Sequence, residues 1–549
     1  MDVFNLRESV VDEYKAYVES FVRVLDPRVS GFVQKELASG ELWPDAVLQL
    51  NPAFNPGQTL QRLADAGTIH PDTARFFGED IQLYRHQEEA LHIAKRGEPY
   101  IVTTGTGSGK SLTYLIPIYD AVVRSNPANH QVRALIVYPM NALINSQHAA
   151  LKRYAEENFP DSKVRFDMYT GQTREEDRAR ILADPPHILL TNYVMLEYLL
   201  MRSFERTLLA TATENLDFVV MDELHFYRGR QGADVAMLIR RVAQKAGKDV
   251  QTIGTSATMT TEGSREERKE TVARVASTQF GVTVPAANVV DETLQRMAKV
   301  PVPASSDELR QAVEMEPPAK NVEAVVNHPL TAWLEEAFGL DTEDGRLVRK
   351  HPETFDNALR RLVEETGLTE ETCRQGLIAV LEAGSEAQTN PDQPVLAFRL
   401  HQFLSSGSSV YTTLEPPDTR QLSMDEQYKD EEGRVLFPLA FCRECGQDYY
   451  LVSRLESADQ ETLIPASPMV GSSRDEIPGE VGYFSIEDDL WEGGPEELPE
   501  HWFRPLKSGP KIRDNYSDHV PRPYTASTDG TLTSGHSNSE YGVQGWFQP

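Results

Sequence analysis

The sequence holds few cysteines and no long apolar run. Only three cysteines occur among its 549 residues, which excludes a disulfide framework and favours a reducing compartment. No stretch approaches the roughly 18 consecutive apolar residues that a membrane span needs. The first residues include Asp2, Glu8 and Asp12, whereas a secretory signal begins basic and continues apolar. We therefore expect a cytoplasmic protein with no membrane partner.

Positive charge is also scarce. The chain has 54 lysines and arginines against 84 aspartates and glutamates, giving a net charge of −30. Proteins that hold nucleic acid by phosphate neutralisation alone are usually basic. This balance argues against a simple basic binding module. Any nucleic-acid site must be a local groove, built partly from backbone N–H groups, or must be completed elsewhere.

The apolar pattern divides the chain into four expected regions. Residues 1–80 have helical spacing at the start and are typical of an accessory region. Residues 81–284 alternate short apolar runs with helical stretches, and residues 285–405 are expected to be mainly helical. Residues 406–549 are rich in proline, glycine, serine and acids, so an irregular region of short strands and loops is expected.

The second region predicts an α/β fold. Several of its apolar runs lack polar alternation, as strands covered on both faces do, so a parallel sheet wrapped by helices is expected. The runs are YIVTT (100–104), ALIVY (134–138), HILLT (187–191), DFVVM (217–221) and QTIGTS (251–256). This domain would be flanked by a mainly helical N-terminal region and by a helical plus irregular C-terminal region.

A glycine-rich loop follows the first run and precedes a helix candidate over 112–123. It reads Thr104, Gly105, Thr106, Gly107, Ser108, Gly109, Lys110 and Ser111. Strand, glycine loop and helix are the context of a phosphate-binding loop, whose N–H groups bind anionic oxygens. Lys110 is placed to reach the β- and γ-phosphates of ATP, and the Ser111 hydroxyl to ligate Mg²⁺. Thr104 stands where the consensus has glycine, a change the loop entrance should tolerate.

Two acids end the fourth apolar run. Asp222 and Glu223 follow DFVVM directly, and ligands of open parallel sheets bind just beyond the carboxyl ends of the strands. Asp222 is suited to hold Mg²⁺, and Glu223 to orient and deprotonate an attacking water. Two acids after a strand are common by chance. Together with the phosphate loop, however, they favour an ATP-hydrolysing site.

These pieces resemble superfamily 2 helicases of the DEAD/DEAH type, whose ATP-binding domain is RecA-like. The box here reads Asp222, Glu223, Leu224 and His225, and Ser256, Ala257 and Thr258 follow the next run. The resemblance implies that His225 bonds toward that Ser-Ala-Thr segment, which couples the ATP site to nucleic acid. It also implies that Gln87 reads the adenine edge. A capping role for His225 and a solvated Gln87 are the alternatives.

The resemblance also implies a track for one nucleic-acid strand. Hydroxyls and backbone N–H groups on this track would contact phosphates without reading sequence, so few lysines are needed. The residues concerned are Pro139, Asn141, Thr170, Gly171, Thr191 and Asn192.

Three segments resemble a narrower group, the Hrq1/YprA-type (MrfA-like) DNA-repair helicases. Many of these carry a DUF1998 region, and related members belong to Druantia- and DISARM-type phage-defence systems. The segments are YPMNAL (138–143), DELHFYRGRQGADVAMLIRR (222–241) and FRLHQF (398–403). The superfamily resemblance covers residues 81–280, and the narrower one extends to about residue 450. It implies DNA as the nucleic-acid partner.

The arginine pattern of a second motor domain, Q-x-x-G-R-x-G-R, is missing from the sequence. Arg228 and Arg230 do not replace it, because they follow the acidic box on the same domain. Arginine fingers contribute about 10³–10⁵ in rate in related NTPases. We therefore expect a truncated or split polypeptide, with a second RecA-like domain supplied in trans or by a missing C-terminal part.

The cysteines leave two interpretations open. Cys442 and Cys445 form a C-x-x-C pair, which is half of a tetrahedral Zn²⁺ site. The sequence has no second such pair, and neither His401 nor His536 has convincing spacing. Two unligated thiols in a loop are the alternative, and Cys373 lies in a helical stretch where packing is expected.

Three functions remain at this point. The first is an ATP-driven helicase or translocase. The second is a P-loop ATPase of another class, which the Ser-Ala-Thr segment, Gln87 and the lack of an LSGGQ signature argue against. The third is a catalytically incomplete scaffold that binds nucleotide or nucleic acid, which the missing second motor keeps open.

Overall fold

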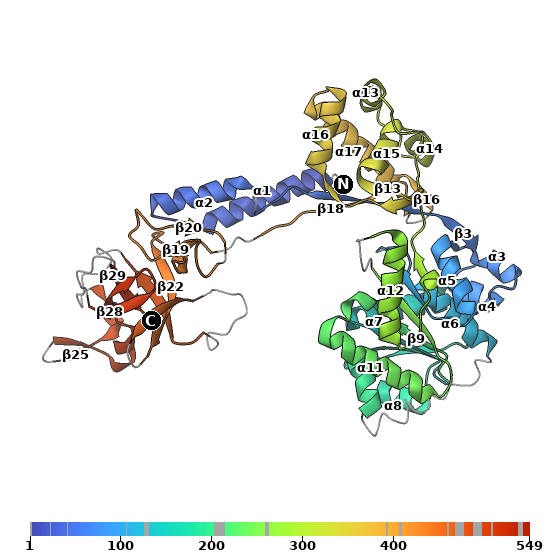
Figure 1. The fold of residues 1–549 in the computed structure, drawn as a ribbon, viewed down its shortest axis with the longest axis horizontal. Helices are drawn as coiled ribbons and strands as arrows, with labels where there is room; N and C mark the ends of the chain where they lie inside the picture. Colours follow the sequence, from blue (N-terminus) through green and yellow to red (C-terminus); the bar gives the residue numbers. More distant parts are fainter. Residues whose placement is uncertain are drawn as a thin grey trace. The chain divides into compact units, whose positions relative to one another are not determined.

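The computed structural model falls into two compact units. Residues 50–351 and 375–397 form one, and residues 1–49, 352–374 and 398–549 form the other (Figure 1). The structure describes residues 3–21, 23–40, 42–105, 107–125, 131–201, 215–257, 263–390, 393–405, 409–425, 427–457, 460–466, 477–486, 497–506, 509–535 and 542–549. No helix within these ranges is both long and apolar enough to cross a bilayer.

A seven-stranded parallel sheet is the centre of the first unit. The strands are β5 (Tyr100–Thr103), β6 (Ala134–Tyr138), β7 (Phe166–Tyr169), β8 (Ile188–Asn192), β9 (Phe218–Met221), β10 (Gln251–Ser256) and β11 (Val289–Asp291). They lie in the order β11-β5-β10-β9-β6-β8-β7, and every pair is parallel. The five apolar runs are all strands, so the expected α/β fold with a parallel sheet is confirmed.

Two hydrophobic cores cover the two faces of this sheet. Tyr100 and Val102 of β5 belong to one core, and Ile101 between them belongs to the other, as the alternation of side chains along a strand requires. Helices α5 (Arg85–Lys95), α6 (Leu112–Arg124) and α7 (Asn141–Asn158) contribute to the first core, and α9 (Tyr193–Met201), α11 (Gly229–Ala246) and α12 (Arg265–Phe280) to the second. Figure 1 shows these helices around the sheet, in the blue-to-green part of the chain.

The sheet domain draws on residues beyond the expected range 81–284. Helices α3 (Leu60–Asp65) and α4 (Pro71–Phe77) join the first core. The ring of Phe76 stacks on Tyr119 of α6 with centroids 4.1 Å apart. At the other end, β11 begins at Val289 and pairs with β5. The edge strand of the sheet therefore follows residue 284.

Helices and a tight hairpin follow β11 in the same unit. The helices are α13 (Ser306–Glu314), α14 (Val322–Val326) and α15 (Pro329–Leu334). The hairpin joins β13 (Leu340–Glu343) to β14 (Arg346–Arg349) through Asp344 and Gly345, whose φ angles are 51° and 74°. Positive φ at both central residues is the two-residue turn that matches strand twist, so the turn sets where β14 begins and how it pairs with β13.

The second unit contains a nine-stranded antiparallel sheet. Its strands are β19 (Tyr411–Thr413), β20 (Leu422–Ser423), β21 (Leu436–Phe441), β22 (Asp448–Glu456), β23 (Glu461–Pro465), β24 (Glu480–Ser485), β27 (Arg522–Ser527), β28 (Thr531–Ser534) and β29 (Gly542–Gln548). Short strands were expected here, but not a sheet of this extent, because strands such as β22 alternate buried and half-buried residues. Its antiparallel pairing differs from the parallel sheet of a RecA-like domain.

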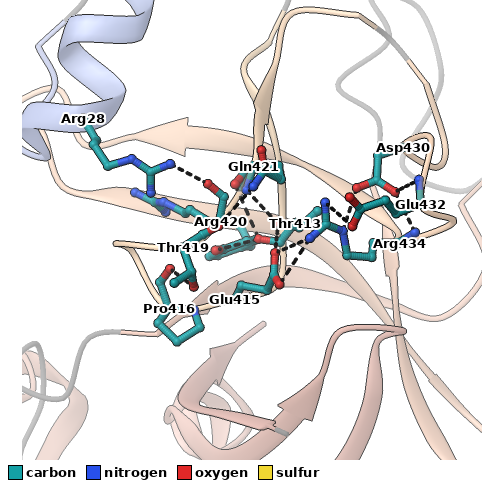
Figure 2. A network of polar contacts seen from close by, with 12 residues as sticks. Arg28, Thr413, Glu415, Pro416, Thr419, Arg420, Gln421, Asp430, Glu432 and Arg434 are labelled. Carbon is teal, nitrogen blue, oxygen red and sulfur yellow. Dashed lines mark hydrogen bonds and ion pairs between the residues drawn. The ribbon is translucent and has the colours of Figure 1, made fainter.

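Helix α2 (Pro27–Ser39) packs on this antiparallel sheet through Val29 and Val33. The buried guanidinium of Arg420, only 1% exposed, bonds Asp448 at 2.6 Å and Asp26 at 2.5 Å. Asp26 also caps α2 by accepting from the next backbone N–H groups. Figure 2 shows Arg420 within the surrounding polar network. The same charge pair therefore fixes the start of the helix to the sheet.

Candidate nucleotide-binding site

The phosphate loop leaves β5 and enters α6 with a strongly curled backbone. Gly107 and Gly109 have φ of 81° and 68°, a region that glycine enters without the steric cost a Cβ would add. Within the loop, the Thr104 and Ser108 hydroxyls lie 2.6 Å apart and are buried. Thr104 is thus accommodated at the loop entrance by a hydroxyl partner. Thr106 lies outside the described residues.

Gln87 lies directly against this loop. Its side-chain oxygen accepts the N–H of Tyr84 at 2.8 Å, and its Nε2 donates to the Gly109 carbonyl at 2.9 Å. A Cβ at Gly109 would lie 2.4 Å from that Nε2, so only glycine permits this approach. The neighbouring His86 contacts the Ser108 carbonyl at 3.0 Å. Gln87 therefore links the start of α5 to the phosphate loop.

Lys110 meets the acidic box across the sheet edge. Strand β10 lies between β5 and β9, and the Lys110 Nζ reaches the Glu223 Oε1 at 3.2 Å. The Lys110 side chain is 11% exposed, and its ammonium makes no hydrogen bond within the described part of the chain. A buried ammonium with free donors is suited to anionic oxygens.

Asp222 and Glu223 are held by Thr255 at the end of β10. The Thr255 hydroxyl donates to Asp222 at 2.6 Å and accepts the Glu223 N–H at 3.1 Å. Burial raises the pKa of Asp222 to about 6, and the hydrogen bond from Thr255 opposes that rise. Glu223 adopts a φ of 53°, which is uncommon for a residue with a side chain.

His225 connects the acidic box to the segment after β10. Its Nδ1 accepts the Ala257 N–H at 3.3 Å and lies 3.2 Å from the Ser256 hydroxyl. Burial lowers the pKa of His225, so the ring is neutral at pH 7 with its proton assigned to Nε2. The nearby Glu223 Oε2, 3.2 Å from Nδ1, receives no hydrogen bond in the described structure. That oxygen is a buried acceptor without a hydrogen-bond donor among the described residues. Thr258 lies outside the described residues.

Tyr114 is a site residue that the sequence did not reveal. Its hydroxyl lies 3.3 Å from the Tyr138 hydroxyl and interacts electrostatically with the side chains of Asp222 and Ser111. Burial raises the pKa of Tyr114 well above its ordinary value, so it remains a neutral donor. The only sequence signal was its place one turn after Ser111, in an otherwise apolar helix.

These groups fit a nucleoside triphosphate with Mg²⁺. The buried ammonium of Lys110 and the curled loop match phosphate oxygens. Ser111 and Asp222, which both interact electrostatically with Tyr114, supply the oxygen ligands that Mg²⁺ prefers. The Glu223 Oε2 is the acceptor that a water molecule could donate to.

The residues expected on the nucleic-acid track lie at or just after the carboxyl ends of β6, β7 and β8. The Asn192 amide donates to the Asn141 side chain at 2.8 Å, which joins the ends of β8 and α7. The Thr191 hydroxyl is buried and donates to the Tyr169 carbonyl at 2.7 Å. Both contacts order this edge of the sheet.

Only part of that set reaches the surface. Thr170 is buried, and its hydroxyl accepts the Gln172 N–H at 3.1 Å. Gly171 is exposed, whereas Pro139 and Asn141 are half-buried. Any phosphate contact from Thr170 or Thr191 would therefore need backbone groups rather than hydroxyls.

Cys442 and Cys445 form a tight knuckle after β21. The Cys442 N–H donates to the Gln447 carbonyl at 2.8 Å, and Gly446 donates back to Cys442 at 2.9 Å. Backbone N–H groups of Cys445 and Glu444 lower the pKa of Cys442. No cluster of three or more metal-ligating side chains occurs in the described ranges.

The other candidate ligands do not complete this knuckle. Cys373 is a buried free thiol in α17 (Glu370–Glu386). His401 bonds Gln49 at 3.0 Å. His536 lies outside the described residues.

Comparison with known proteins places the site in a family. Residues 84–266 match the model of the DEAD/DEAH box helicases. YprA of Bacillus subtilis, an uncharacterised ATP-dependent helicase, is 33% identical over 181 residues, covering 32% of this chain and 23% of that protein. The Druantia protein DruE of Escherichia coli is 24% identical over 357 residues, 43% of this chain and 19% of its own.

An uncharacterised ATP-dependent helicase of Methanocaldococcus jannaschii is also similar, with 33% identity over 187 residues, covering 33% of this chain and 26% of that protein. A solved structure of the DUF1998 helicase MrfA with DNA and AMPPNP superposes at a TM-score of 0.36 and 24% identity, covering 46% of this chain and 33% of MrfA. The chain thus spans about a quarter or less of these three curated relatives. Residues 84–266 are a DEAD/DEAH box helicase domain, related to the YprA-type ATP-dependent helicases.

Proposed function

We propose that this chain is the ATP-binding part of a helicase or translocase that moves on DNA. The contact between the Lys110 ammonium and the Glu223 carboxylate at 3.2 Å carries the proposal. It joins the phosphate loop to the acidic box at the carboxyl edge of the sheet, within the family match. ATP and Mg²⁺ are the cofactors that this family uses.

Each site residue has a proposed role in ATP hydrolysis. Lys110 binds phosphate oxygens, and Ser111 and Asp222 hold Mg²⁺, which neutralises charge that develops on the phosphates. Glu223 orients a water and accepts its proton through the open Oε2. Withdrawal of Lys110 from Glu223 would leave that carboxylate free for this task. Gln87 remains the proposed adenine reader.

The coupling residues follow from the His225 contacts. His225 bonds to Ser256 and Ala257, so movement of the acidic box reaches the end of β10 directly. The proposed nucleic-acid strand runs over Pro139, Asn141, Gly171 and Asn192, with backbone groups of Thr170 and Thr191. The preference for DNA rests on the resemblance of residues 138–143 and 222–241 to DNA-repair and phage-defence helicases.

We also propose that a second RecA-like domain completes the motor. The seven-stranded sheet of this chain is parallel, and the large sheet of the second unit is antiparallel. The same observation favours the second candidate function, a scaffold that binds nucleotide or nucleic acid without turnover. Both functions place the protein with ATP and nucleic acid in the cytoplasm.

ATPase activity with and without single-stranded DNA tests this proposal. Weak hydrolysis by the isolated chain, with binding of ATP that Lys110→Ala abolishes, supports a motor half. Lys152→Ala is the control, because Lys152 is exposed on α7. Absence of ATP binding by the unmodified chain would reject the proposal. Full DNA-stimulated turnover would reject the need for a second domain.

Zinc is a separate proposal for the cysteine knuckle. The N–H groups of Glu444 and Cys445 favour a thiolate at Cys442, and a thiolate is the form that binds Zn²⁺. Two ligands would come from this knuckle and two from another chain or segment. Elemental analysis of the purified chain, compared with Cys442→Ser, tests it: zinc content that the substitution leaves unchanged would reject the site.

A further inference from the structure

An ion pair from outside the helicase motifs lies against the entrance of the phosphate loop. Arg349 ends β14, and Glu292 directly follows β11. The guanidinium donates through Nε to Oε1 at 3.1 Å and through Nη2 to Oε2 at 3.0 Å. Both side chains are only 18% exposed. This two-point geometry is the strong form of an arginine–carboxylate pair.

The pair contacts the loop through Gly105. The Gly105 N–H donates to the Glu292 Oε2 at 3.3 Å. A Cβ on Gly105 would lie 3.0 Å from the Arg349 Nη2 and 3.2 Å from its Cζ. The guanidinium therefore rests against the Cα of the glycine, while the carboxylate takes one of the loop's backbone donors.

Two further residues hold Arg349 in this place. Its Nη1 donates to the Asn51 side chain at 3.1 Å, and its Cζ lies 6.0 Å from the centre of the Phe54 ring. These contacts do not depend on Glu292. A guanidinium that lost the carboxylate would still be held beside the loop, with two donors freed.

Phosphate loops bind anions through backbone N–H groups, and Glu292 is an anion bound in that way. We infer that Arg349 binds the phosphate chain of a nucleoside triphosphate, and that Glu292 occupies this place in the nucleotide-free protein. The inference rests on the proposed function. It gives the hairpin β13–β14 a direct part in nucleotide binding, and it makes Glu292 a competitor that lowers the affinity.

The competing explanation is that the ion pair only ties the hairpin to the loop. Loss of either partner then loosens the loop, and both losses weaken nucleotide binding. Under our inference the loss of Arg349 lowers the nucleotide affinity, and the loss of the Glu292 charge raises it. Removing Arg349 removes a cation from the phosphates, whereas neutralising Glu292 frees that cation and removes a repelling charge.

Calorimetric titration of the full chain with AMP-PNP and Mg²⁺ separates these explanations. Arg349→Ala should weaken binding about tenfold or more, as expected for a lost charge-assisted contact. Glu292→Gln should tighten binding about threefold. Arg346→Ala, an exposed arginine of the same strand, should leave the affinity unchanged. Equal weakening by Arg349→Ala and Glu292→Gln, or no effect of Arg349→Ala, would overturn the inference.

Two further results keep the outcome unambiguous. If the unmodified chain binds no AMP-PNP, the proposed function itself fails. If it binds and the variants do not diverge, only the role of Arg349 fails. Should Arg349→Ala not fold, as judged by circular dichroism, Glu292→Gln decides alone, because a structural tie predicts weaker binding and competition predicts tighter binding.

Discussion

Asp222 is a buried carboxylate whose negative charge is suited to bind a cation but destabilises the metal-free folded protein. Burial raises its pKa from 3.8 to about 6, despite the hydrogen bonds from Thr255 and Tyr114. Above pH 6 the folded, metal-free protein must therefore keep an ionised group in a poorly solvated place. The unfolded chain carries no such cost.

Asp222→Asn should stabilise the metal-free protein at high pH. The wild-type cost follows from about two pKa units, or ~3 kcal/mol. Because the folded pKa is the higher one, this cost is complete above pH 6 and declines as the pH falls toward 3.8. The variant should be more stable at pH 8 by up to that amount and nearly equal to wild type at pH 4. Urea unfolding in EDTA at pH 8 and at pH 4 measures the free energy of unfolding of both proteins. A stability difference that does not change with pH would contradict the prediction.

Tyr114 should act on Mg²⁺ through Asp222. Its hydroxyl interacts electrostatically with the Asp222 and Ser111 side chains, and outer partners of this kind hold ligand carboxylates in place. Tyr114→Phe should raise the Mg²⁺ concentration needed for half-maximal AMP-PNP binding roughly tenfold. Tyr119→Phe is a matched control, since this tyrosine of the same helix bonds the distant Ser162. A magnesium requirement equal to that of wild type would refute the role.

The central strands could be predicted from sequence because both faces of the sheet are buried. The segments 134–138 and 218–221 are apolar at every position, and each is a fully buried strand. The edge strand β7 escaped notice because three of its four residues are only half-buried. Short strands were expected over 406–549, but their assembly into one large sheet was not, since one face of β22 is only partly covered.

The residues of the candidate site also divide into those that the sequence could predict and those that it could not. Lys110 and Asp222 were found because each stands in a local motif beside a strand. Glu292 and Arg349 carry no motif, and 57 residues separate them in the chain. Only the fold shows that they meet at Gly105. Tyr114 was hidden because an apolar helix accounts for a tyrosine without any polar role.

At the scale of elements, Arg420 fixes α2 to the antiparallel sheet. Arg420→Ala would leave Asp448 and Asp26, which are 4% and 11% exposed, without their cation. Breaking a buried pair in this way costs about 3–5 kcal/mol. Arg434→Ala is the control from the same network in Figure 2, because Arg434 is 24% exposed and pairs with acids near the surface. That change should cost at most about 1 kcal/mol.

Urea unfolding followed by tryptophan fluorescence measures both variants. Similar losses in the free energy of unfolding for Arg420→Ala and Arg434→Ala would show that burial does not determine how much these ion pairs stabilise the protein.

For the whole molecule, each unit has its own hydrophobic core. We expect two transitions in calorimetric unfolding. AMP-PNP with Mg²⁺ should raise only the transition of residues 50–351 and 375–397, which carry the phosphate loop. At 100 times the dissociation constant the ligand adds ~2.7 kcal/mol. Lys110→Ala should abolish the shift. A single transition, or a shift of both transitions, would contradict this expectation.

The order of the chain has a consequence for its synthesis. Val29 and Val33 of α2 pack against Val435, Phe437 and other strand residues of one core. About 400 residues separate these partners, and ribosomes add about 5–20 residues per second. The apolar face of α2 therefore leaves the ribosome roughly 20–80 s before its sheet exists. During that interval the apolar face of α2 is exposed to solvent. Binding of the nascent chain by a holding chaperone would therefore increase the yield of folded protein.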